Sequence, residues 1–355
     1  MTISIRPGVR RRAATVPALV AAAALTLTAC GSDGDDSAEA AAEGFGDITV
    51  QLSWIKNAEF AGEFFAEENG YYADAGFDTV TLNPGPGAIE NLVASGQAEF
   101  GTSNTIATAQ VVAEEDAPLK IVAAKFQRNP FTVLSLAEGA NIATPQDLVG
   151  TTIGVQAGGN EALFAALLEV NGIDPADVTV VPVEYDPAPL IDGEVDGFFA
   201  YVTNESITVE FAGHAVTNLM LNDNGLPFVA EAIITTDEII AERPDMVKAF
   251  LEATILGWKD ALADPEEGAR LAVEVYGADL DLQLDKEVEQ AIVQNELVLT
   301  PDVEANGLLT ITDELIAENL RTLATAGIEL EADELFDLSL LDELLDEKPE
   351  LAELS

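Results

Sequence analysis

Cysteine and histidine are almost absent from this chain. Each occurs once among 355 residues, as Cys30 and His214. An internal disulfide is therefore excluded, and so is a metal site built from histidine and cysteine ligands. A carboxylate-only site would remain, but the stretch Asp192–Asp196, which hints at a calcium loop, lacks the required spacing. We expect neither a metal nor a cofactor.

Basic residues are also scarce. The sequence holds 15 lysines and arginines against 64 aspartates and glutamates, for a net charge of −49. A surface this acidic repels phosphate groups, so binding to nucleic acid is excluded. Acidity on this scale also fits life in high salt, where carboxylates keep a protein hydrated. That hypothesis concerns habitat and does not bear on the ligand.

Long apolar runs are limited to the beginning of the chain. Four arginines between Arg6 and Arg12 precede an apolar run over residues 16–27, which has the length of a signal segment rather than of a membrane span. The run ends in Leu-Thr-Ala-Cys30, which resembles the lipobox of bacterial lipoproteins. We expect residues 1–29 to be removed and Cys30 to carry lipid, on the extracellular face of the membrane. The paired arginines leave twin-arginine export open beside the general secretory route.

Removal of residues 1–29 would leave an even more acidic protein. That segment holds four arginines and no acidic residue, so the remaining net charge would be 11 − 64 = −53. Residues 30–46 are small and acidic, which is typical of a flexible tether that repels itself.

From Asp47 onward, short β-branched runs alternate with helical patterns. This alternation predicts an α/β fold whose mixed, mostly parallel sheets are flanked by helices. In the first part of the chain we expect strands at 48–52, 78–82 and 98–101 and helices at 58–69 and 89–95. The same theme returns with strands at 152–155 and 178–183 and a helix at 161–170.

Two segments of the chain echo each other. Leu92–Gly101 and Leu190–Phe199 each have the pattern of a helix end, a glycine turn and a short strand. Together with the repeated order of strands, the echo predicts two similar lobes that present strand ends to a shared crevice. Open α/β sheets bind ligands at such carboxyl ends.

Long helices dominate after Asn224. We expect one from Arg243 to Ala261 and another that starts at Asp264. The tail, residues 332–354, has the pattern of an acidic, leucine-rich helical stretch that Pro349 breaks, and we expect one apolar stripe to pack against the first lobe.

Aromatic, amide and carboxylate side chains follow the expected strand ends, and such a set suits a flat heterocyclic ligand. Trp54, just past the first strand, is expected to stack on the ligand, and its alternative is a place in the core. Asn57 and Glu59 would read the ligand's edge. Stabilisation of the first helical turn is the alternative for Glu59.

Further candidates lie at other strand ends. Ser103 and Asn104 would either bond the ligand or cap the next helix. Gly158 and Asn160 lie where the N–H groups at a helix start meet an acceptor, although a simple turn uses the same residues. Tyr185 would supply the opposing stacking face.

Several segments resemble the thiamine-pyrimidine-precursor branch of the periplasmic binding proteins. The strongest match is Gln51–Gly62, with the sequence Gln-Leu-Ser-Trp-Ile-Lys-Asn-Ala-Glu-Phe-Ala-Gly. Residues 91–101, 126–130 and 195–205 fit the same pattern. The resemblance implies a type II two-lobed fold that closes on a small ligand held in the interlobe cleft. It also implies that Tyr201, Asn204 and Glu205 lie near the return crossover and contact the ligand.

The two lobes implied by the resemblance are joined by two crossover strands. On this interpretation residues 47–130 and 228–355 form lobe 1, and residues 131–227 form lobe 2.

The function implied by the resemblance is that of a substrate-binding protein of an ABC importer. It would be a lipid-anchored monomer that delivers a hydroxymethylpyrimidine or formylaminopyrimidine compound, a precursor in thiamine biosynthesis, to a membrane permease. The ATPase would be another chain, since no Walker motif occurs here. Riboflavin is the main alternative ligand, followed by sulfonates or nitrate.

Two other classes of function stay open at this point, a sensory lipoprotein and a cell-surface enzyme of pyrimidine metabolism. Some eukaryotic members of the family are enzymes that consume their own histidine and carry a cysteine-rich motif. His214 is the only histidine here and no cysteine follows Cys30. We therefore expect no enzymatic activity.

Overall fold

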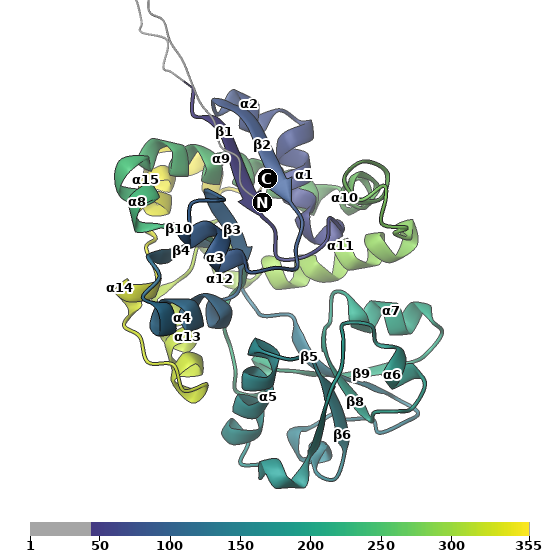
Figure 1. The fold of residues 1–355 in the computed structure, drawn as a ribbon. Helices are drawn as coiled ribbons and strands as arrows, with labels where there is room; N and C mark the ends of the chain where they lie inside the picture. Colours follow the sequence, from purple (N-terminus) through teal and green to yellow (C-terminus); the bar gives the residue numbers. More distant parts are fainter. Residues whose placement is uncertain (1–43, 355) are drawn as a thin grey trace, which may run out of the picture. The chain divides into compact units, whose positions relative to one another are not determined.

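Two five-stranded sheets organise the computed structural model, which describes residues 44–354. The signal segment, Cys30 and nearly all of the tether predicted above lie outside these residues. Gly44–Ser355 forms one compact unit that contains both sheets (Figure 1). Across residues 44–354, no helix is both long and apolar enough to cross a membrane.

The first sheet has the strand order β2-β1-β3-β10-β4. Its parallel part is β2, β1 and β3, and β10 runs antiparallel to both β3 and β4. The strands are β1 (Gly46–Gln51), β2 (Phe77–Asn83), β3 (Phe100–Ser103), β4 (Leu119–Phe126) and β10 (Ala230–Thr236).

The second sheet repeats this plan in the order β7-β6-β8-β5-β9. Here β7, β6 and β8 are parallel, and β5 runs antiparallel to β8 and β9. Half of the eight strand pairings in the described residues are thus antiparallel, so the sheets are mixed. The strands are β5 (Phe131–Leu136), β6 (Thr152–Val155), β7 (Thr179–Pro182), β8 (Gly197–Tyr201) and β9 (Val216–Met220).

The chain passes between the sheets twice, and each passage leads from an edge strand of one sheet to an inner strand of the other. The outer strand β4 leads into β5, and the outer strand β9 leads back into β10. Asn129 ties the two passages together, since its Nδ2 donates to the carbonyl oxygen of Leu226 at 2.9 Å. Arg128 in the same segment pairs with Asp223, and both side chains are largely exposed.

Helices cover both sheets, and they fall into three groups along the chain (Figure 1). The first group contains η1 (Ala58–Phe60), α1 (Ala61–Glu68), α2 (Tyr71–Asp74), α3 (Ile89–Ala94) and α4 (Thr105–Glu115). The second contains η2 (Pro145–Leu148), α5 (Gly159–Val170), η3 (Pro175–Asp177), α6 (Ala188–Ile191), α7 (Glu205–Phe211) and η4 (Asn222–Asn224). The third contains α8 (Asp237–Glu242), α9 (Pro244–Ala263), α10 (Pro265–Leu271), η5 (Ala272–Tyr276), α11 (Leu284–Val298), α12 (Pro301–Asn306), α13 (Asp313–Thr325), α14 (Ala332–Leu335), α15 (Ser339–Glu347) and η6 (Pro349–Ala352).

Alternation along the strands divides the core between the faces of each sheet. Neighbouring residues of a strand point to opposite faces, so Val122 and Ile121 on β4 join different hydrophobic clusters. Phe198 and Phe199 on β8 do the same in the second sheet. The sheets are therefore buried on both faces, as expected for an α/β protein.

A glycine notch lets α1 and α9 approach closely. A Cβ on Gly62 would lie 2.2 Å from Cδ1 of Trp258, and a Cβ on Gly257 would lie 2.1 Å from the carbonyl oxygen of Gly62. Neither distance is compatible with a side chain, so the two helices can pack this tightly only with glycine at both positions. Trp258 is fully buried at this contact.

The acidic tail packs against the first sheet's side of the molecule. Helix α15 buries Leu340, Leu341 and Leu344 and contacts α9 and β4. The expected long helix is interrupted before α15, because Phe336 forms a β-bridge with Ile121 of β4. The prediction of one buried stripe is confirmed by these leucines.

Candidate functional site

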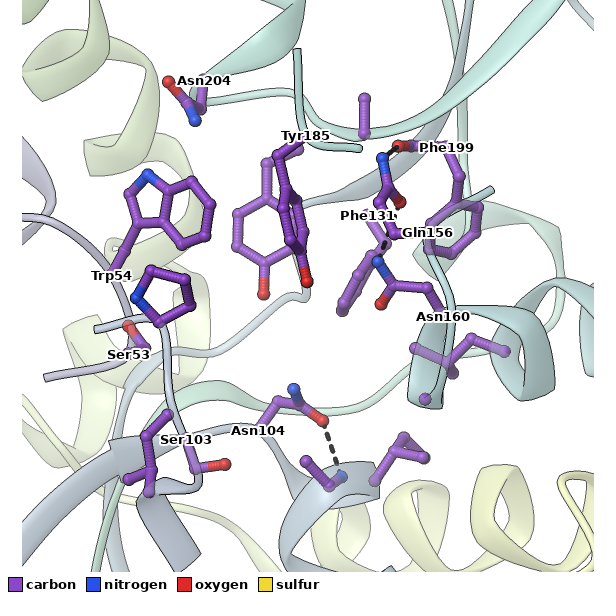
Figure 2. A pocket seen from close by; sticks show the side chains of 18 of the residues that line it. Ser53, Trp54, Ser103, Asn104, Phe131, Gln156, Asn160, Tyr185, Phe199 and Asn204 are labelled. Atoms are coloured by element: carbon purple, nitrogen blue, oxygen red, sulfur yellow. Dashed lines mark hydrogen bonds between the residues drawn. The ribbon is translucent and has the colours of Figure 1, made fainter. Parts of the chain in front are cut away.

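The carboxyl ends of four parallel strands meet at one cleft. Ser53 and Trp54 follow β1, Asn104 follows β3, Gln156 follows β6, and Asn204 follows β8. The cleft has a volume of about 330 Å³, at the lower end of the range for small-molecule pockets. Figure 2 shows these side chains around an open space. Open α/β sheets place ligands at such strand ends, and here both sheets contribute.

Aromatic rings form much of the wall. Trp54 and Tyr185 come from opposite sides of the cleft, and their rings meet edge to face with centroids 4.9 Å apart. Phe131 and Tyr201, on adjacent strands of the second sheet, pack edge to face at 4.6 Å. Phe199 completes the set of aromatic residues that line the cleft. Rings of this kind suit a flat ligand.

Amide side chains supply directed donors and acceptors. Gln156 donates from Nε2 to the carbonyl oxygen of Phe199 at 2.9 Å, and Asn160 donates from Nδ2 to Oε1 of Gln156 at 2.9 Å. Asn104 caps α4, with its Oδ1 accepting from the N–H of Ala107 at 3.0 Å, which leaves Nδ2 for another partner (Figure 2). These amides therefore hold fixed orientations before any ligand arrives.

Carboxyl groups are the only charged side chains among the residues that line the described cleft. They belong to Glu59, Glu90, Glu205 and Glu231, with no lysine, arginine or histidine beside them in that lining. Glu90 accepts a hydrogen bond from the hydroxyl of Ser103. A cleft with this charge disfavours anions and favours ligands that donate hydrogen bonds or carry positive charge.

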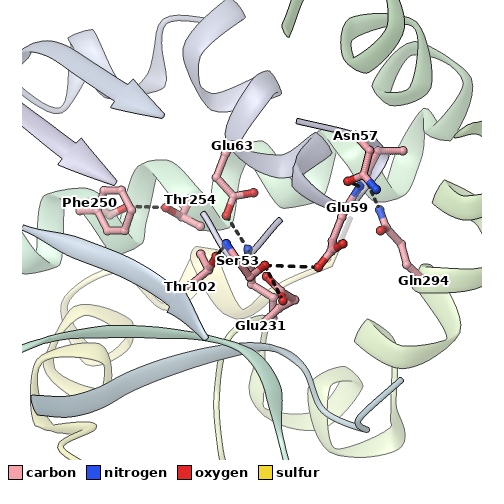
Figure 3. A network of polar contacts seen from close by, with 11 residues as sticks. Ser53, Asn57, Glu59, Glu63, Thr102, Glu231, Phe250, Thr254 and Gln294 are labelled. Atoms are coloured by element: carbon pink, nitrogen blue, oxygen red, sulfur yellow. Dashed lines mark hydrogen bonds and ion pairs between the residues drawn. The ribbon is translucent and has the colours of Figure 1, made fainter. Parts of the chain in front are cut away.

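Glu59 and Glu231 share a buried network with Ser53 (Figure 3). The hydroxyl of Ser53 donates to Glu231 at 2.8 Å and lies 3.4 Å from Oε1 of Glu59. Burial and then the nearby charge of Glu231 raise the pKa of Glu59 well above its usual range. A proton held at this pair would let one carboxyl group donate while the other accepts.

The ammonium group of Lys125 lies beside the carboxyl groups of this network and offsets their negative charge. Its Nζ lies 2.8 Å from Glu63 and 3.5 Å from Glu231, and all three side chains are buried. Burial alone would lower the pKa of Lys125, but the carboxylates of Glu63 and Glu231 outweigh it and raise the pKa. The buried cluster therefore contains one ammonium group and three carboxyl groups, those of Glu59, Glu63 and Glu231. We infer that the cluster is most stable with a proton bound.

Glu231 also has an unusual backbone. It is a non-glycine residue with φ of +46° inside β10, close to where the register of β10 with β4 shifts. A positive φ costs a side-chain-bearing residue on the order of 1 kcal/mol and is tolerated where the surroundings fix it. Here the conformation coincides with the side chain's contacts to Ser53 and Lys125.

Glu205 and Tyr201 form a second pair in the cleft. The N–H of Tyr201 donates to Oε2 of Glu205 at 2.8 Å, and Asn204 donates from Nδ2 to Oε1 at 3.1 Å. Burial raises the pKa of Glu205, although these hydrogen bonds and the charge of Lys286 oppose the effect. Burial also raises the pKa of the Tyr201 hydroxyl.

The structure brings most of the predicted site residues to this one cleft. Those that line it are Trp54, Glu59, Ser103, Asn104, Asn160, Tyr185, Tyr201, Asn204 and Glu205. Their contact with a ligand stays a prediction.

Two of the predicted residues lie elsewhere. Asn57 is buried beside the cleft, where its Oδ1 caps η1 and its Nδ2 donates to Gln290 at 3.4 Å. Gly158 is outside the lining, and its neighbour Gly159 takes that place. Gly158 has a φ of +93°, which a turn into α5 requires and which explains glycine there.

Several lining residues were missed from the sequence. They include Ser53, Pro86, Gly87, Glu90, Phe131, Gln156, Phe199 and Glu231. Ser53 and Gln156 follow parallel strands directly, so the strand-end rule would have found them. Glu231 carried no such signal, because β10 enters the first sheet only after the chain returns from the second.

No group of three or more acidic, histidine or cysteine side chains within residues 44–354 is arranged to hold a metal ion.

Comparison with known families decides the relationship of the chain. Residues 57–268 match the family described as NMT1/THI5 like. The chain belongs to that family. The named relatives of this chain include binding proteins and enzymes, so membership of the family does not by itself specify the function.

Three relatives show this range. The riboflavin-binding protein RibY of Chloroflexus aurantiacus is 31% identical over 70% of this chain and 74% of its own length. A formylaminopyrimidine-binding protein of Halalkalibacterium halodurans is 28% identical over 62% of this chain and 68% of its own. A 4-amino-5-hydroxymethyl-2-methylpyrimidine phosphate synthase of Schizosaccharomyces pombe is 28% identical over 61% and 66%.

Solved structures confirm the predicted fold. The periplasmic aliphatic sulphonate binding protein SsuA of Escherichia coli superposes with a TM-score of 0.62 at 14% identity, covering 79% of this chain and 91% of its own. The chain therefore has the periplasmic-binding-protein fold, with two mixed sheets flanked by helices.

Proposed function

We propose that this protein is the solute-binding component of an ABC importer and that it takes up a flat, nitrogen-containing heterocycle. The observation that carries the proposal is the cleft itself, where aromatic rings and four carboxyl groups come together without a basic residue in the described lining. The binding proteins among its relatives support the same class of function.

An aminopyrimidine of the formylaminopyrimidine type is the first candidate ligand. Its amino group and adjacent ring nitrogen would pair with a carboxyl group through two hydrogen bonds. Glu59, beside Ser53 and Glu231, offers such a group, and its raised pKa allows it to donate as well as accept. Trp54 and Tyr185 would enclose the ring.

Riboflavin is the second candidate, and a specific observation favours it. The relative with 31% identity over 265 residues is a riboflavin-binding protein. The hydroxyl groups of a ribityl chain would find partners in Asn104, Gln156 and Asn160, which lie in the same cleft. Sulfonates and nitrate fit less well, because an anion would face carboxylates.

The proposal includes the arrangement of the chain on the cell. Cys30 would carry lipid and hold the protein on the extracellular face of the membrane, and the tether would end before Gly44, because residues 44–46 belong to the compact unit rather than to the tether predicted to reach residue 46. Residues 47–130 with 228–355 would form one lobe and residues 131–227 the other, closing as a monomer about the segments near Asn129 and Leu226. A permease and an ATPase would be its partners, and no reaction would be catalysed.

Calorimetric titration tests the ligand class. The chain from residue 31 onward, which contains the compact unit Gly44–Ser355, would be titrated with formylaminopyrimidine, hydroxymethylpyrimidine, riboflavin and an alkanesulfonate. We expect a Kd of about 1 μM or tighter for a pyrimidine or for riboflavin and no binding of the sulfonate. Binding of the sulfonate alone would refute the charge argument.

Two further measurements separate the remaining alternatives. Incubation with each ligand followed by mass spectrometry should return the ligand unchanged, whereas a product would identify an enzyme. For the anchor, mass spectrometry of the membrane-bound protein should find Cys30 as the N-terminal residue with the added mass of its lipid. An unmodified Cys30 would contradict lipid attachment at that residue.

A further inference from the structure

Helix α11 holds the first side of the cleft through its buried face. Glu287 accepts from the N–H of Ala58 at 2.8 Å, and Gln294 donates to the carbonyl oxygen of Ala58 at 2.9 Å. Gln290, between them on the same helical face, accepts from Asn57 at 3.4 Å. These contacts fix η1, the short helix that carries Glu59 into the cleft.

The start of the same helix reaches the other side. Lys286 donates from Nζ to Oδ1 of Asn204 at 3.0 Å. Asn204 follows β8 of the second sheet, whereas α11 packs on η1 and β4 of the first-sheet side. In Figure 1, α11 lies beside α7, which begins directly after Asn204. The contact therefore joins two bodies of structure that the backbone connects only through the passages after β4 and β9.

The contact with Lys286 also affects the orientation of a side chain that lines the cleft. Because Asn204 accepts from Lys286 with its Oδ1, its Nδ2 is left to donate to Glu205 at 3.1 Å. Asn204 and Glu205 both line the cleft, and Lys286 does not. Lys286 therefore determines which end of the Asn204 amide faces Glu205 without touching the space that a ligand would occupy.

The contact between Lys286 and Asn204 is surrounded by carboxyl groups, whose negative charge Lys286 offsets. Its positive charge acts on Glu205 on one side and on Glu287 on the other. On the neighbouring turn, Glu210 of α7 and Glu289 of α11 face each other, and burial together with that repulsion raises the pKa of Glu210. Without Lys286, the α7–α11 contact would bring carboxylates together with less to offset their repulsion.

We propose that Lys286 is a positioning residue that latches the closed cleft and couples closure to the orientation of Asn204 and Glu205. The proposal rests on the proposed binding function. A latch that forms only when the two sides meet slows ligand release, because the ligand leaves after the sides separate. It has little effect on the first encounter with the ligand.

Ligand-exchange kinetics test the latch with formylaminopyrimidine and riboflavin as probes. For Lys286→Met, which keeps most of the unbranched side chain and loses the charge and donors, we expect the dissociation rate to rise about tenfold with the association rate changed less than about threefold. Lys286→Arg, which keeps the charge and the donors, should have a dissociation rate close to that of the unsubstituted protein. Lys259→Met is the matched control, because this substitution removes the same charge away from the cleft. Lys259 lies on α9 and donates to the carbonyl oxygen of Glu350 on η6.

A double-mutant cycle identifies the partner. In an Asn204→Ala background, Lys286→Met should have a clearly smaller further effect on dissociation than in the parent protein, since the acceptor is gone and only the charge acting on Glu205 and Glu287 is left to lose. Additive effects of the two substitutions, or a dissociation rate of Lys286→Met equal to that of the unsubstituted protein, would overturn the proposal.

A measurement without ligand distinguishes failure of the latch from failure of the proposed function. Two spin labels would be attached to cysteines introduced at Asp74 and Gln146, which are exposed on the two sides and have no competing cysteine after Cys30. Lys286→Met should move the distance distribution towards longer, open distances, and Lys259→Met should not. An unchanged distribution refutes the latch, while failure of both probes to bind refutes the ligand proposal alone.

Discussion

The rings of Trp54 and Tyr185 meet edge to face across the cleft, with an interplanar angle of 63° and centroids 4.9 Å apart. A flat ligand sandwiched between two rings needs about 7 Å between them, two stacking distances of about 3.5 Å. The two rings must therefore separate or turn when a ligand enters between them. Tyr185 is free to do so, since it is 43% exposed.

Loss of either ring should weaken binding. Trp54→Ala is expected to raise the Kd for the bound heterocycle about tenfold or more, because a stacking surface is lost, and Tyr185→Ala should act in the same direction. Tyr185→Phe, which keeps the ring, is the matched control and should bind almost normally. Calorimetric titration measures all three, and full affinity in Trp54→Ala would show that the indole does not contact the ligand.

Glu59 should make stability depend on pH. Because burial and Glu231 raise the pKa of Glu59, the folded state binds a proton that the unfolded state releases near pH 4.5. The folded state is then favoured at low pH, and stability falls as the pH rises from that value towards the raised pKa. Glu59→Gln should remove this fall and increase the free energy of unfolding at pH 8 by about 1 to 3 kcal/mol.

Urea unfolding followed by circular dichroism between pH 5 and 8 measures the effect of Glu59→Gln. Glu114→Gln on the exposed face of α4 is the control and should leave the pH dependence unchanged. A Glu59→Gln protein that loses stability with rising pH as the unsubstituted protein does would place the proton elsewhere in the cluster.

The notch between α1 and α9 should tolerate no side chain. Gly62→Ala would put a methyl group 2.2 Å from the indole of Trp258, so the helices must move apart at a cost of about 1 to 3 kcal/mol or more. Gly87→Ala, where no heavy atom lies within 4 Å of an added Cβ, is the control for the same substitution. Equal unfolding midpoints for the two variants would contradict the packing described here.

The acidic tail should be held by its leucines rather than by its ion pairs. Leu344 is 2% exposed, and Leu344→Ala is expected to cost about 2 to 5 kcal/mol. Lys348 pairs with Glu252 at 2.6 Å but is 43% exposed, so Lys348→Ala should cost less than about 1 kcal/mol. Thermal unfolding of the two variants gives the comparison, and a larger loss for Lys348→Ala would reverse it.

The sequence allowed the elements of the parallel halves to be predicted closely. The strand expected at 152–155 is β6, and the strand expected at 78–82 lies within β2. The strand expected at 98–101 is displaced, since β3 covers Phe100–Ser103. The echo between Leu92–Gly101 and Leu190–Phe199 corresponds to α3–β3 and α6–β8, with left-handed glycines at equivalent turns.

Long-range pairing limited the prediction of the site. Strand-end reasoning identified Trp54 and Asn104 because their positions depend on local pattern and on the rule for parallel sheets, whereas Tyr201 followed from the family resemblance. The positions of Glu231 and Lys286 near the cleft depend on where the chain returns after residue 220. No periodicity in their own segments reveals which distant residues they contact. Hydrogen bonds between residues separated by 82 or 178 positions decide their roles.

The placement of the two tryptophans gives this protein a pair of optical probes. Trp258 is sealed in the glycine notch, so its emission should change only when the helices come apart. Trp54 lies in the cleft beside Tyr185, where an incoming ring would quench it. Since the chain has only these two tryptophans, Trp54→Phe leaves a reporter of unfolding alone, and the difference from the parent protein reports occupancy.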